Sequence, residues 1–435
     1  MNRWRTAGVV FAGLIFEGGL IWMVITGNLR TQMPVFFAVF ALISLVYLIV
    51  IWQVHQIPLA VIMGFGVVFR FTLLFMTPSL SDDIYRYVWD GRVLWAGINP
   101  YSYAPAADAL MHLRDADVFP LINHSDLPTI YPPVAQVVFG AGYGISEGFW
   151  GIKVLLVCAD VVTGWLLIRL LRHYKQAEGL FIIYFWHPLV LLEISGSGHV
   201  EGVGIAILMA AVLCFVKGRD FWALGALGGA VLVKFLPLVF FPGFVRWLGK
   251  VPINWQALLV LPCVVAFAYM PFAWTGAPVL GSLGTYAAHW SFNSPVFDGL
   301  LLVFGDGMMV RRVIGGLFAG VVLVLVWRKI PLLRLIYITL AAFVLLTPTL
   351  HPWYVVWLVP LLVFYRNPAW VAFTLLVVLS YQVLIRYEIH GVWEELPWVR
   401  WVEFGGFVGV WVLSSICQSR EIIRPFLAGK KKQES

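Results

Sequence analysis

Long apolar runs, separated by short polar connections, dominate this sequence of 435 residues. A helix needs about 20 apolar residues to cross the hydrocarbon core of a bilayer, and most of the runs approach that length. Eleven such runs lie at 8–27, 34–54, 58–76, 150–171, 178–194, 198–216, 254–273, 311–327, 331–348, 368–386 and 402–418. A twelfth, 351–365, is shorter, but its neighbours leave it no path other than a crossing. We therefore predict an all-α polytopic membrane protein with about twelve transmembrane helices, forming a single integral membrane domain over residues 1–435.

The composition agrees with this class. Charged residues make up 12% of the chain and hydrophobic residues 61%, against roughly 25% and 45–50% in soluble proteins. The net charge is +7. In a membrane protein, such an excess of basic residues is expected in the cytoplasmic loops and does not indicate nucleic-acid binding. The first run exceeds a signal-peptide core of roughly 7–15 residues, so we expect it to be a retained span. The cysteines fall in apolar runs without C-x-x-C spacing, which predicts neither zinc nor disulfides; they are Cys158, Cys214, Cys263 and Cys417.

Two further apolar segments do not resemble spans. Residues 133–146 are short and carry three glycines, which predicts an interfacial or re-entrant segment. Residues 221–245 are interrupted by Lys234 and Pro237 and have basic residues on both flanks. A charge inside an apolar segment is costly unless it lines a cavity. We therefore predict a re-entrant helical hairpin with both ends in the cytoplasm and Lys234 near its buried tip.

The positive-inside rule orients the chain. A cytoplasmic N-terminus places most basic clusters on the cytoplasmic side: 169–175, 217–219, 246–250, 328–329 and the basic tail 419–435. Arg311 and Arg312 are the exception. This orientation predicts that the long loop 77–131 lies on the external or periplasmic face of the cell (inner) membrane.

The loop 77–131 concentrates the acidic residues, with seven of the 22 in the chain. Asp83, Tyr87 and Asp90 recur at spacings of four and three, which predicts one helical face. The sequence GINP, which begins at Gly97, then ends any helix. An ordinary solvated loop is one interpretation of these acids. Adjacent carboxylates at the end of a span, followed by aromatics and arginines, instead favour a site that binds sugar.

The sugar-site interpretation assigns roles by chemistry. Asp82 and Asp83 are the candidate catalytic residues, because they lie a few residues beyond a predicted span. Aromatic faces stack on pyranose rings, while aspartate and arginine hydrogen-bond hydroxyls and phosphates. The loop residues that we expect to bind substrate are Arg86, Tyr87, Asp90, Arg92, Asn99, Tyr101, His124 and Tyr131.

Other polar residues fall at the same predicted membrane face. Those that we expect to join the site are His199, Glu201, Lys234, His289, His351 and Tyr354. Taken singly, each histidine is accounted for by an interfacial hydrogen bond, but their convergence on one face favours a shared site. Asp160, His187 and Glu193 lie within spans, where interhelical polar pairs account for them.

Several chemistries are excluded by missing motifs. The sequence has no H-E-x-x-H or Cys/His zinc motif, no P-loop and no G-x-G-x-x-G phosphate cradle. We expect no required cofactor. A divalent metal on Asp82 and Asp83 stays an alternative that we do not favour, because two vicinal carboxylates lack a third oxygen ligand in the same motif.

These residues carry a resemblance to the GT-C class of membrane glycosyltransferases. The motif DDIYRY from Asp82, with NPYSYAP and YPP further on, resembles the first external loop of polyprenol-phosphate-mannose-dependent mannosyltransferases. The stretches KVLLVCADVVTGWLLIRLLR, WHPLVLLEISGSGHVEGVGIAI and VKFLPLVFFP are similar to the eukaryotic mannosyltransferase that adds the first mannose to glycosylphosphatidylinositol. HPWYVVWLVPL resembles a late-span motif of both groups. The resemblance runs in order over about residues 81–365.

The resemblance implies an inverting transfer of a sugar, most simply mannose, from a polyprenyl-phosphate donor to a glycolipid or glycan acceptor at the outer face. Such a displacement needs one general base on the acceptor side. The bacterial pattern matches the base to Asp83 and the eukaryotic pattern to Asp82, and we place Asp83 first. The leaving phosphate needs positive charge, which Lys234 would supply, assisted by Arg86 or His351.

Two alternatives stay open at this point. A transporter or flippase of lipid-linked sugars would carry paired repeats with a mid-membrane site, and the sequence shows no convincing repeat. An inactive member of the fold would only bind glycolipid. The sequence does not distinguish mannose from another lipid-phosphate sugar, nor does it identify the acceptor.

Overall fold

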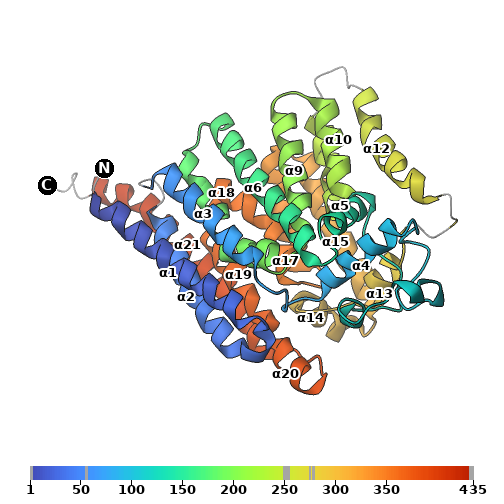
Figure 1. The fold of residues 1–435 in the computed structure, drawn as a ribbon. Coiled ribbons are helices and arrows are strands. Elements are labelled where there is room, and N and C mark those ends of the chain that lie inside the picture. Colours follow the sequence, from blue (N-terminus) through green and yellow to red (C-terminus); the bar gives the residue numbers. More distant parts are fainter. Residues whose placement is uncertain (1–2, 54–56, 248–254, 274–275, 277–279, 431–435) are drawn as a thin grey trace.

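The computed structural model describes residues 3–53, 57–247, 255–273, 276 and 280–430. Over these residues the chain is helical and forms no β-strand; Phe292 and Thr349 make an isolated bridge. The helices assemble into a bundle in which the first two pack against each other along one flank (Figure 1). The last helix packs against the helix at residues 368–376. This arrangement confirms the predicted all-α polytopic class.

Long helices account for most of the bundle. They are α1 (Arg3–Thr26), α2 (Met33–Trp52), α3 (Leu59–Leu74), α6 (Phe149–His173), α9 (Glu201–Val216), α12 (Trp255–Ala273), α15 (Gly307–Trp327), α16 (Leu332–Leu346) and α21 (Pro397–Lys430).

Interrupted helices complete the bundle. Short α7 (Ile182–Phe185) and α8 (Pro188–Val190) lead into the π-helical η6 (Leu191–Gly196). The interruption before Pro188 follows from its missing N–H and from the restriction that it places on the preceding residue. Two later segments are each built of three pieces: α17 (Pro352–Val355), η8 (Val356–Leu358) and α18 (Val359–Tyr365), then α19 (Pro368–Leu376), η9 (Val377–Gln382) and α20 (Val383–His390).

Every predicted span coincides with a helical segment. Seven described helices are long and apolar enough to cross a membrane, and the pair Glu178–Phe185 and Pro188–Gly196, bent by 52°, makes an eighth. The other four predicted spans coincide with shorter apolar helices: Leu59–Leu74, Glu201–Val216, Leu332–Leu346 and Pro352–Tyr365. A helix of sixteen residues, such as Leu59–Leu74, is about 24 Å long, which is less than the ~30 Å thickness of the hydrocarbon core. Twelve crossings therefore stay a prediction.

The segment 221–245 has the shape of the predicted hairpin. Helix α10 (Asp220–Val231) ends at a break that holds Lys234, and η7 (Leu236–Phe240) and α11 (Phe241–Trp247) follow. The segment 133–146 forms α5 (Pro133–Ile145), which packs between α4 (Asp83–Trp95) and α6. The backbone N–H groups of Val134 and Ala135 donate to the Leu232 carbonyl at 3.0 and 3.2 Å. These bonds tie the break of the hairpin to the start of α5.

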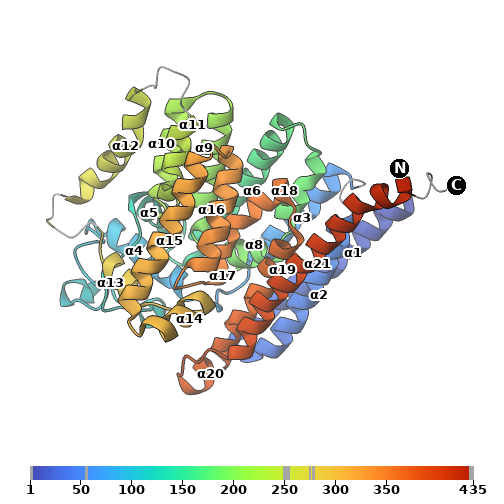
Figure 2. The same ribbon diagram turned by 180° about the vertical axis from the view of Figure 1, so that it is seen from behind.

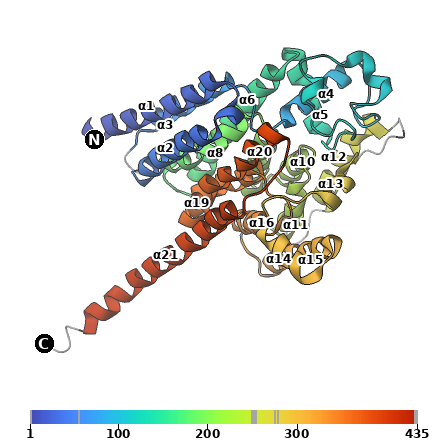
Figure 3. The same cartoon turned by 90° about the horizontal axis from the view of Figure 1, so that it is seen from below.

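Three of the shorter helices gather at one end of the bundle. Helices α4 (Asp83–Trp95), α13 (Leu283–His289) and α14 (Pro295–Phe304) lie at the end opposite to the α9–α10 connection (Figures 1 and 2). Helix α21 projects away from the bundle toward its C-terminal end (Figure 3). Of the predicted basic tail 419–435, residues 431–435 lie outside the described residues, as does Lys250.

Asp160 and His187 have interhelical polar partners inside the bundle, as predicted. Arg70 Nε donates to Asp160 at 2.8 Å, and the Tyr184 hydroxyl donates to the other Asp160 oxygen at 2.5 Å. His187 Nε2 lies 3.0 Å from the Thr374 hydroxyl. Because hydrocarbon offers no competing hydrogen bonds, such pairs fix the positions of α3, α6 and α19 relative to one another.

Candidate active site

Helix α4 begins at the two vicinal aspartates. Asp82 is its N-cap residue and Asp83 its first residue, and the Asp82 side chain makes no capping hydrogen bond. The Asp82 carboxylate instead accepts a hydrogen bond from Arg30 Nη2 at 2.6 Å. Burial raises the pKa of Asp82, and the guanidinium of Arg30 partly opposes this effect. Asp82 is therefore engaged in an ion pair.

Asp83 has different partners. Its carboxylate accepts a hydrogen bond from Asn123 Nδ2 at 3.1 Å and a longer one from the Tyr131 hydroxyl at 3.5 Å. No salt bridge to Asp83 is found in the described part of the chain. Its negative charge acts on Tyr286 and Tyr354, which come from distant segments. Asp83 is thus a half-buried carboxylate that faces the interior of the site without a cationic partner.

The rest of α4 is anchored by a buried network. Arg86 donates to Asp90 at 2.9 Å and to the Leu127 carbonyl at 3.0 Å. Asp90 also accepts from the Thr129 hydroxyl at 2.5 Å and from Gln136 Nε2 at 3.1 Å. Arg86 and Asp90, both predicted to bind substrate, thus hold the loop 77–131 onto α4 and α5.

Other predicted loop residues are engaged in similar ways. Arg92 pairs with Asp115. Asn99 donates to the Phe272 carbonyl at 2.9 Å, and the Tyr101 hydroxyl donates to the Tyr131 carbonyl at 2.7 Å. These contacts fix the loop, and direct substrate contact by these three residues stays a prediction.

Tyr87 and Tyr131 form an aromatic wall beside Asp83. The Tyr87 ring stacks on Phe139 at 4.4 Å between centroids and meets the Tyr131 ring edge-on at 5.0 Å. Burial raises the pKa of Tyr131 well above its usual value, and the charge of Asp83 adds to the shift. The Tyr131 hydroxyl therefore stays protonated as a hydrogen-bond donor to Asp83.

Lys234 and Glu201 form an ion pair at the tip of the hairpin. The Glu201 side chain is 1% exposed, whereas that of Lys234 is 26% exposed. The Lys234 ammonium also lies 4.2 Å from the centroid of the Tyr354 ring. The sequence also allows a purely structural pair between Lys234 and a nearby acid such as Glu201 or Asp160. The structure shows the pair with Glu201, whereas Asp160 binds Arg70. Contact between Lys234 and a donor phosphate stays a prediction.

An aromatic row joins this ion pair to the loop 77–131. The hydroxyls of Tyr354 and Tyr286 are 2.6 Å apart, and Tyr286 stacks on Trp290 at 5.5 Å between centroids. Burial raises the pKa of Tyr286 to about 12. His124 meets Trp290 edge-on at 4.8 Å. The row brings His124 and Tyr354 to one site although they are distant in sequence.

Two predicted histidines stack on one tryptophan. The rings of His199 and His351 lie nearly parallel to that of Trp353, with centroids 4.3 and 4.2 Å from its centroid. His199 Nδ1 lies 3.0 Å from a Glu193 carboxylate oxygen, and the Tyr381 hydroxyl donates to Glu193 at 3.0 Å. Glu193 is thus paired as predicted for a polar residue inside a span, and its partner is a residue of the site.

The structure separates the predicted residues into three groups. Those linked to one another by contacts or by their charges are Asp83, Tyr87, His124, Tyr131, His199, Glu201, Lys234, His351 and Tyr354. Asp82, beside them, is paired with Arg30. Those that support the loop are Arg86, Asp90, Arg92, Asn99 and Tyr101. His289 is exposed and bonds to the Thr285 carbonyl of its own helix at 3.0 Å.

Sequence reasoning missed several contributors. Arg30 lies in the connection between the first two spans, and a lone arginine beside a membrane end is too common to single out. Asn123 stands next to the predicted His124 and Tyr286 lies close to His289, so both were adjacent to considered residues. Trp353 lies inside the motif HPWYVVWLVPL, where only His351 and Tyr354 were selected.

The described residues contain no group of three or more His, Cys, Asp or Glu side chains that could hold a metal ion. The functional groups of the site are a carboxylate, a lysine and histidines. Aromatic side chains surround them near the end of a helical membrane bundle. Such a set is suited to binding a sugar and an anionic group together.

A comparison with models of protein families identifies the family of this chain. Residues 6–249, more than half of the chain, match the model described as alpha-(1->6)-mannopyranosyltransferase, N-terminal domain. The chain therefore belongs to this family. The match includes α4, the loop 77–131 and Lys234.

Curated relatives bear names of the same kind. Alpha-(1->6)-mannopyranosyltransferase A of Corynebacterium glutamicum is 24% identical over 185 residues, covering 41% of this chain and 36% of the relative. Alpha-(1->6)-mannopyranosyltransferase B of the same organism is 23% identical over 349 residues, covering 66% and 56%. GPI mannosyltransferase 1 of Gibberella zeae is 33% identical over 173 residues, covering 38% and 32%. The chain thus spans about a third to a half of the relatives that it matches. No solved structure matches it significantly.

Proposed function

We propose that this protein is an inverting mannosyltransferase that takes mannose from a polyprenyl-phosphate donor and transfers it to a glycolipid or glycan acceptor. The observation that carries the proposal is the position of Asp83. It is a carboxylate without a cationic partner, at the first turn of α4, facing a site that also holds Lys234 and two stacked histidines. The family match and the names of the relatives support the sugar and the reaction class.

The proposed mechanism is a single displacement. Asp83 accepts the proton of the acceptor hydroxyl as that oxygen attacks the anomeric carbon of mannose. The bond from this carbon to the phosphate oxygen breaks, and the lipid phosphate leaves with the electron pair. Phosphate is a weak base, so the leaving group needs positive charge rather than a proton. Lys234 supplies this charge, with His351 near it, and no metal is required.

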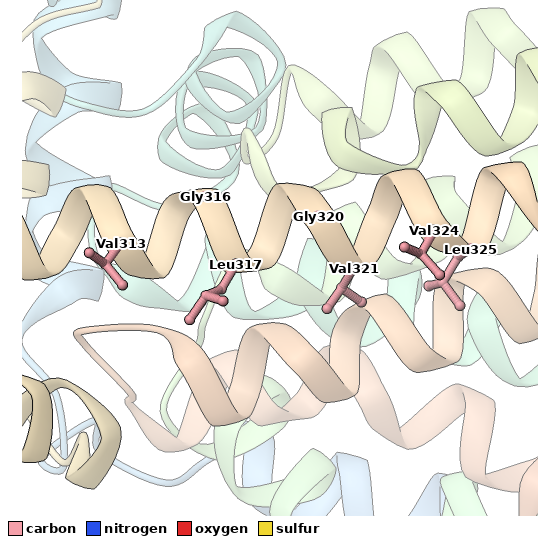
Figure 4. A pocket seen from close by; sticks show the side chains of 7 residues that line it. All are labelled: Val313, Gly316, Leu317, Gly320, Val321, Val324 and Leu325. Atoms are coloured by element: carbon pink, nitrogen blue, oxygen red, sulfur yellow. The ribbon is translucent and has the colours of Figure 1, made fainter.

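An apolar groove along α15 supports a site for the isoprenoid tail of the donor. The groove has a volume of about 640 Å³ and is open at the protein surface, and its lining residues all come from α15 (Figure 4). Its lining residues are Val313, Gly316, Leu317, Gly320, Val321, Val324 and Leu325. Arg311, two residues before its start, donates to the carbonyls of Ala287 and Trp290 at 2.9 and 2.7 Å. The groove therefore begins beside the aromatic row of the site.

The proposal includes catalysis at the external face of the cell membrane, since the basic clusters assign the loop 77–131 to that side. A variant with all four cysteines replaced and a single Asp108→Cys substitution tests this orientation, because Asp108 is exposed. In intact cells an impermeant maleimide should label position 108. Protection of this position would contradict the orientation.

Purified protein in liposomes tests the reaction. With polyprenyl-phosphate mannose and membrane glycolipid acceptors, we expect mannosylated product and free polyprenyl phosphate in equal amounts, with inverted configuration at the anomeric carbon. A parallel assay follows movement of labelled donor between leaflets. Donor movement without product would contradict the enzyme and favour a flippase; donor binding alone would favour an inactive member. Activity with another lipid-phosphate sugar, but not mannose, would correct the sugar.

A further inference from the structure

The connection between α1 and α2 reaches the start of α4, about fifty residues away in sequence. It forms the short η1 helix (Leu29–Gln32), which Asn28 caps by accepting from the Arg30 N–H at 3.1 Å. The Leu29 N–H donates to the Ser79 hydroxyl at 3.0 Å, and Arg30 Nε donates to the Ser79 carbonyl. With the bond from Arg30 Nη2 to Asp82, three contacts hold the segment that precedes Asp83.

Asp82 adopts an unexpected orientation for its position. Aspartate is among the preferred N-cap residues because its carboxylate accepts from the free N–H groups of the first helical turn. Asp82 is the N-cap of α4 but makes no such bond, and its carboxylate faces Arg30 instead. The Asp83 N–H is left with a long contact to the Ser81 hydroxyl at 3.3 Å. Arg30 therefore determines where the Asp82 carboxylate lies.

The charges around the two aspartates explain why this orientation matters. Asp82 faces Arg30 on η1, the charge of Asp83 on α4 and the charge of Glu388 on α20. Asp83 faces Asn123 and Tyr131, and its charge and that of Glu201 act on the same tyrosines. Two neighbouring carboxylates disfavour each other's ionisation. Among the residues that act on Asp82, Arg30 is the cation that offsets this repulsion.

We propose that Arg30 is a positioning residue for catalysis. It holds the Asp82 carboxylate turned away from the end of α4 and balances its charge, so that Asp83 is the carboxylate left without a cationic partner and available to the acceptor hydroxyl. This inference rests on the proposed function, in which Asp83 is the base.

The test compares Arg30→Gln, Asp82→Asn, the double variant and Arg30→Lys in the reconstituted transfer assay. The readout is the acidic limb of the rate–pH profile, where the base becomes protonated. Arg30→Gln leaves two uncompensated carboxylates, so the limb should move to higher pH by about one unit, a roughly tenfold loss of rate on that limb. Asp82→Asn leaves Arg30 without its anion, so the limb should move to lower pH. In the double variant the shifts should cancel.

Arg30→Lys keeps the charge and should keep the limb near that of the wild type. A merely structural clamp would lower the unfolding temperature of Arg30→Gln and Asp82→Asn without moving the limb. Absent shifts, or shifts of the same sign in these two variants, would overturn the inference. Asp82→Asn and Arg30→Lys keep the test decisive if Arg30→Gln does not fold. Asp83→Asn, assayed alongside, separates the two proposals: a rate near wild type would remove the proposed base itself.

Discussion

Buried or partly buried charges occur both in the middle of the bundle, at Arg70 and Asp160, and at its loop end, at Asp83, His199, Glu201 and Lys234. The two regions differ in how completely these charges are paired. In the middle, Arg70 and Asp160 are both almost fully buried, and each Asp160 oxygen has a donor. Arg70 also donates to the carbonyls of Gly66 and Phe185. At the loop end, Lys234 is partly exposed, one Glu201 oxygen and His199 Nε2 have no hydrogen-bond partner in the described chain, and Asp83 has no cation.

This difference in pairing distinguishes charged residues that stabilise the fold from charged residues that bind substrate. A buried polar atom without a partner costs free energy, and a ligand or solvent that supplies the partner removes this cost. In the Arg70–Asp160 pair both carboxylate oxygens have donors, and Arg70 Nη2 is the one atom of the pair without a partner among the described residues. We infer that charges in the middle hold the helices together, whereas charges at the loop end await substrate.

The largest effect is expected from Asp83→Asn. The amide keeps the size and the contact with Asn123 but is not a base, so transfer should fall by about 10²–10⁴-fold while donor binding is retained. The rate is measured by product formation in liposomes, and binding by retention of labelled donor.

Asp82→Asn is the matched control, since it makes the same change one residue away at an engaged carboxylate. It should cost less than about tenfold at neutral pH, because proton abstraction is not its role. Equal losses in both variants would remove the distinction between the two aspartates. Near wild-type rates in both would move the search for a base to Glu201 and His351.

The second prediction concerns the middle of the bundle. Asp160→Asn leaves the Arg70 guanidinium without an anion, which should lower the free energy of unfolding by about 3–5 kcal/mol. The protein that remains folded should transfer mannose at a normal rate per molecule. Unfolding in detergent, with activity scaled to folded protein, measures both. A large loss of rate per folded molecule would instead assign Asp160 to function.

Much of the fold could be predicted because helices that cross a membrane need long apolar runs, and such runs are visible in the sequence. Apolar runs located all twelve helical segments, and the Lys234–Pro237 interruption located the hairpin. The break before Pro188 and the interruptions inside Pro352–Tyr365 were not foreseen, because apolar length alone does not distinguish a straight span from an interrupted one.

The site was predicted less completely. Residue chemistry selected Asp83, Lys234 and His199, but it also selected Arg86 and Asp90, whose charges cancel in a buried pair. That pair has the i,i+4 spacing of one helix, so the local pattern contained it and the selection overlooked it. The pairing of Asp82 with Arg30, in contrast, depends on which segments become neighbours. A single sequence does not contain this information in its local pattern.

The third prediction tests the role of Lys234 at the loop end. Lys234→Met should weaken binding of polyprenyl-phosphate mannose by about 10–100-fold, since a charge-assisted contact to phosphate is lost. The single variant also leaves Glu201 buried and unpaired, so Lys234→Met with Glu201→Gln separates this cost from binding. If Lys234 is only structural, the double variant should regain both stability and donor affinity. If Lys234 binds phosphate, the double variant should regain stability alone.

The smallest effect is expected in the groove of α15, which belongs to neither charged region and tests whether the loop-end site continues into lipid. A Cβ at Gly316 would meet nothing within 4 Å, so Gly316→Leu should fold normally and fill part of the groove. We expect the donor KM to rise by up to about tenfold for a long-chain polyprenyl donor, because fewer methylene groups are buried. A donor with a truncated tail should be unaffected. Gly315→Leu, on the neighbouring position with equal free space but outside the groove lining, is the matched control. An equal effect of Gly316→Leu on both donors, or of both leucine variants on the long donor, would contradict a tail site in the groove.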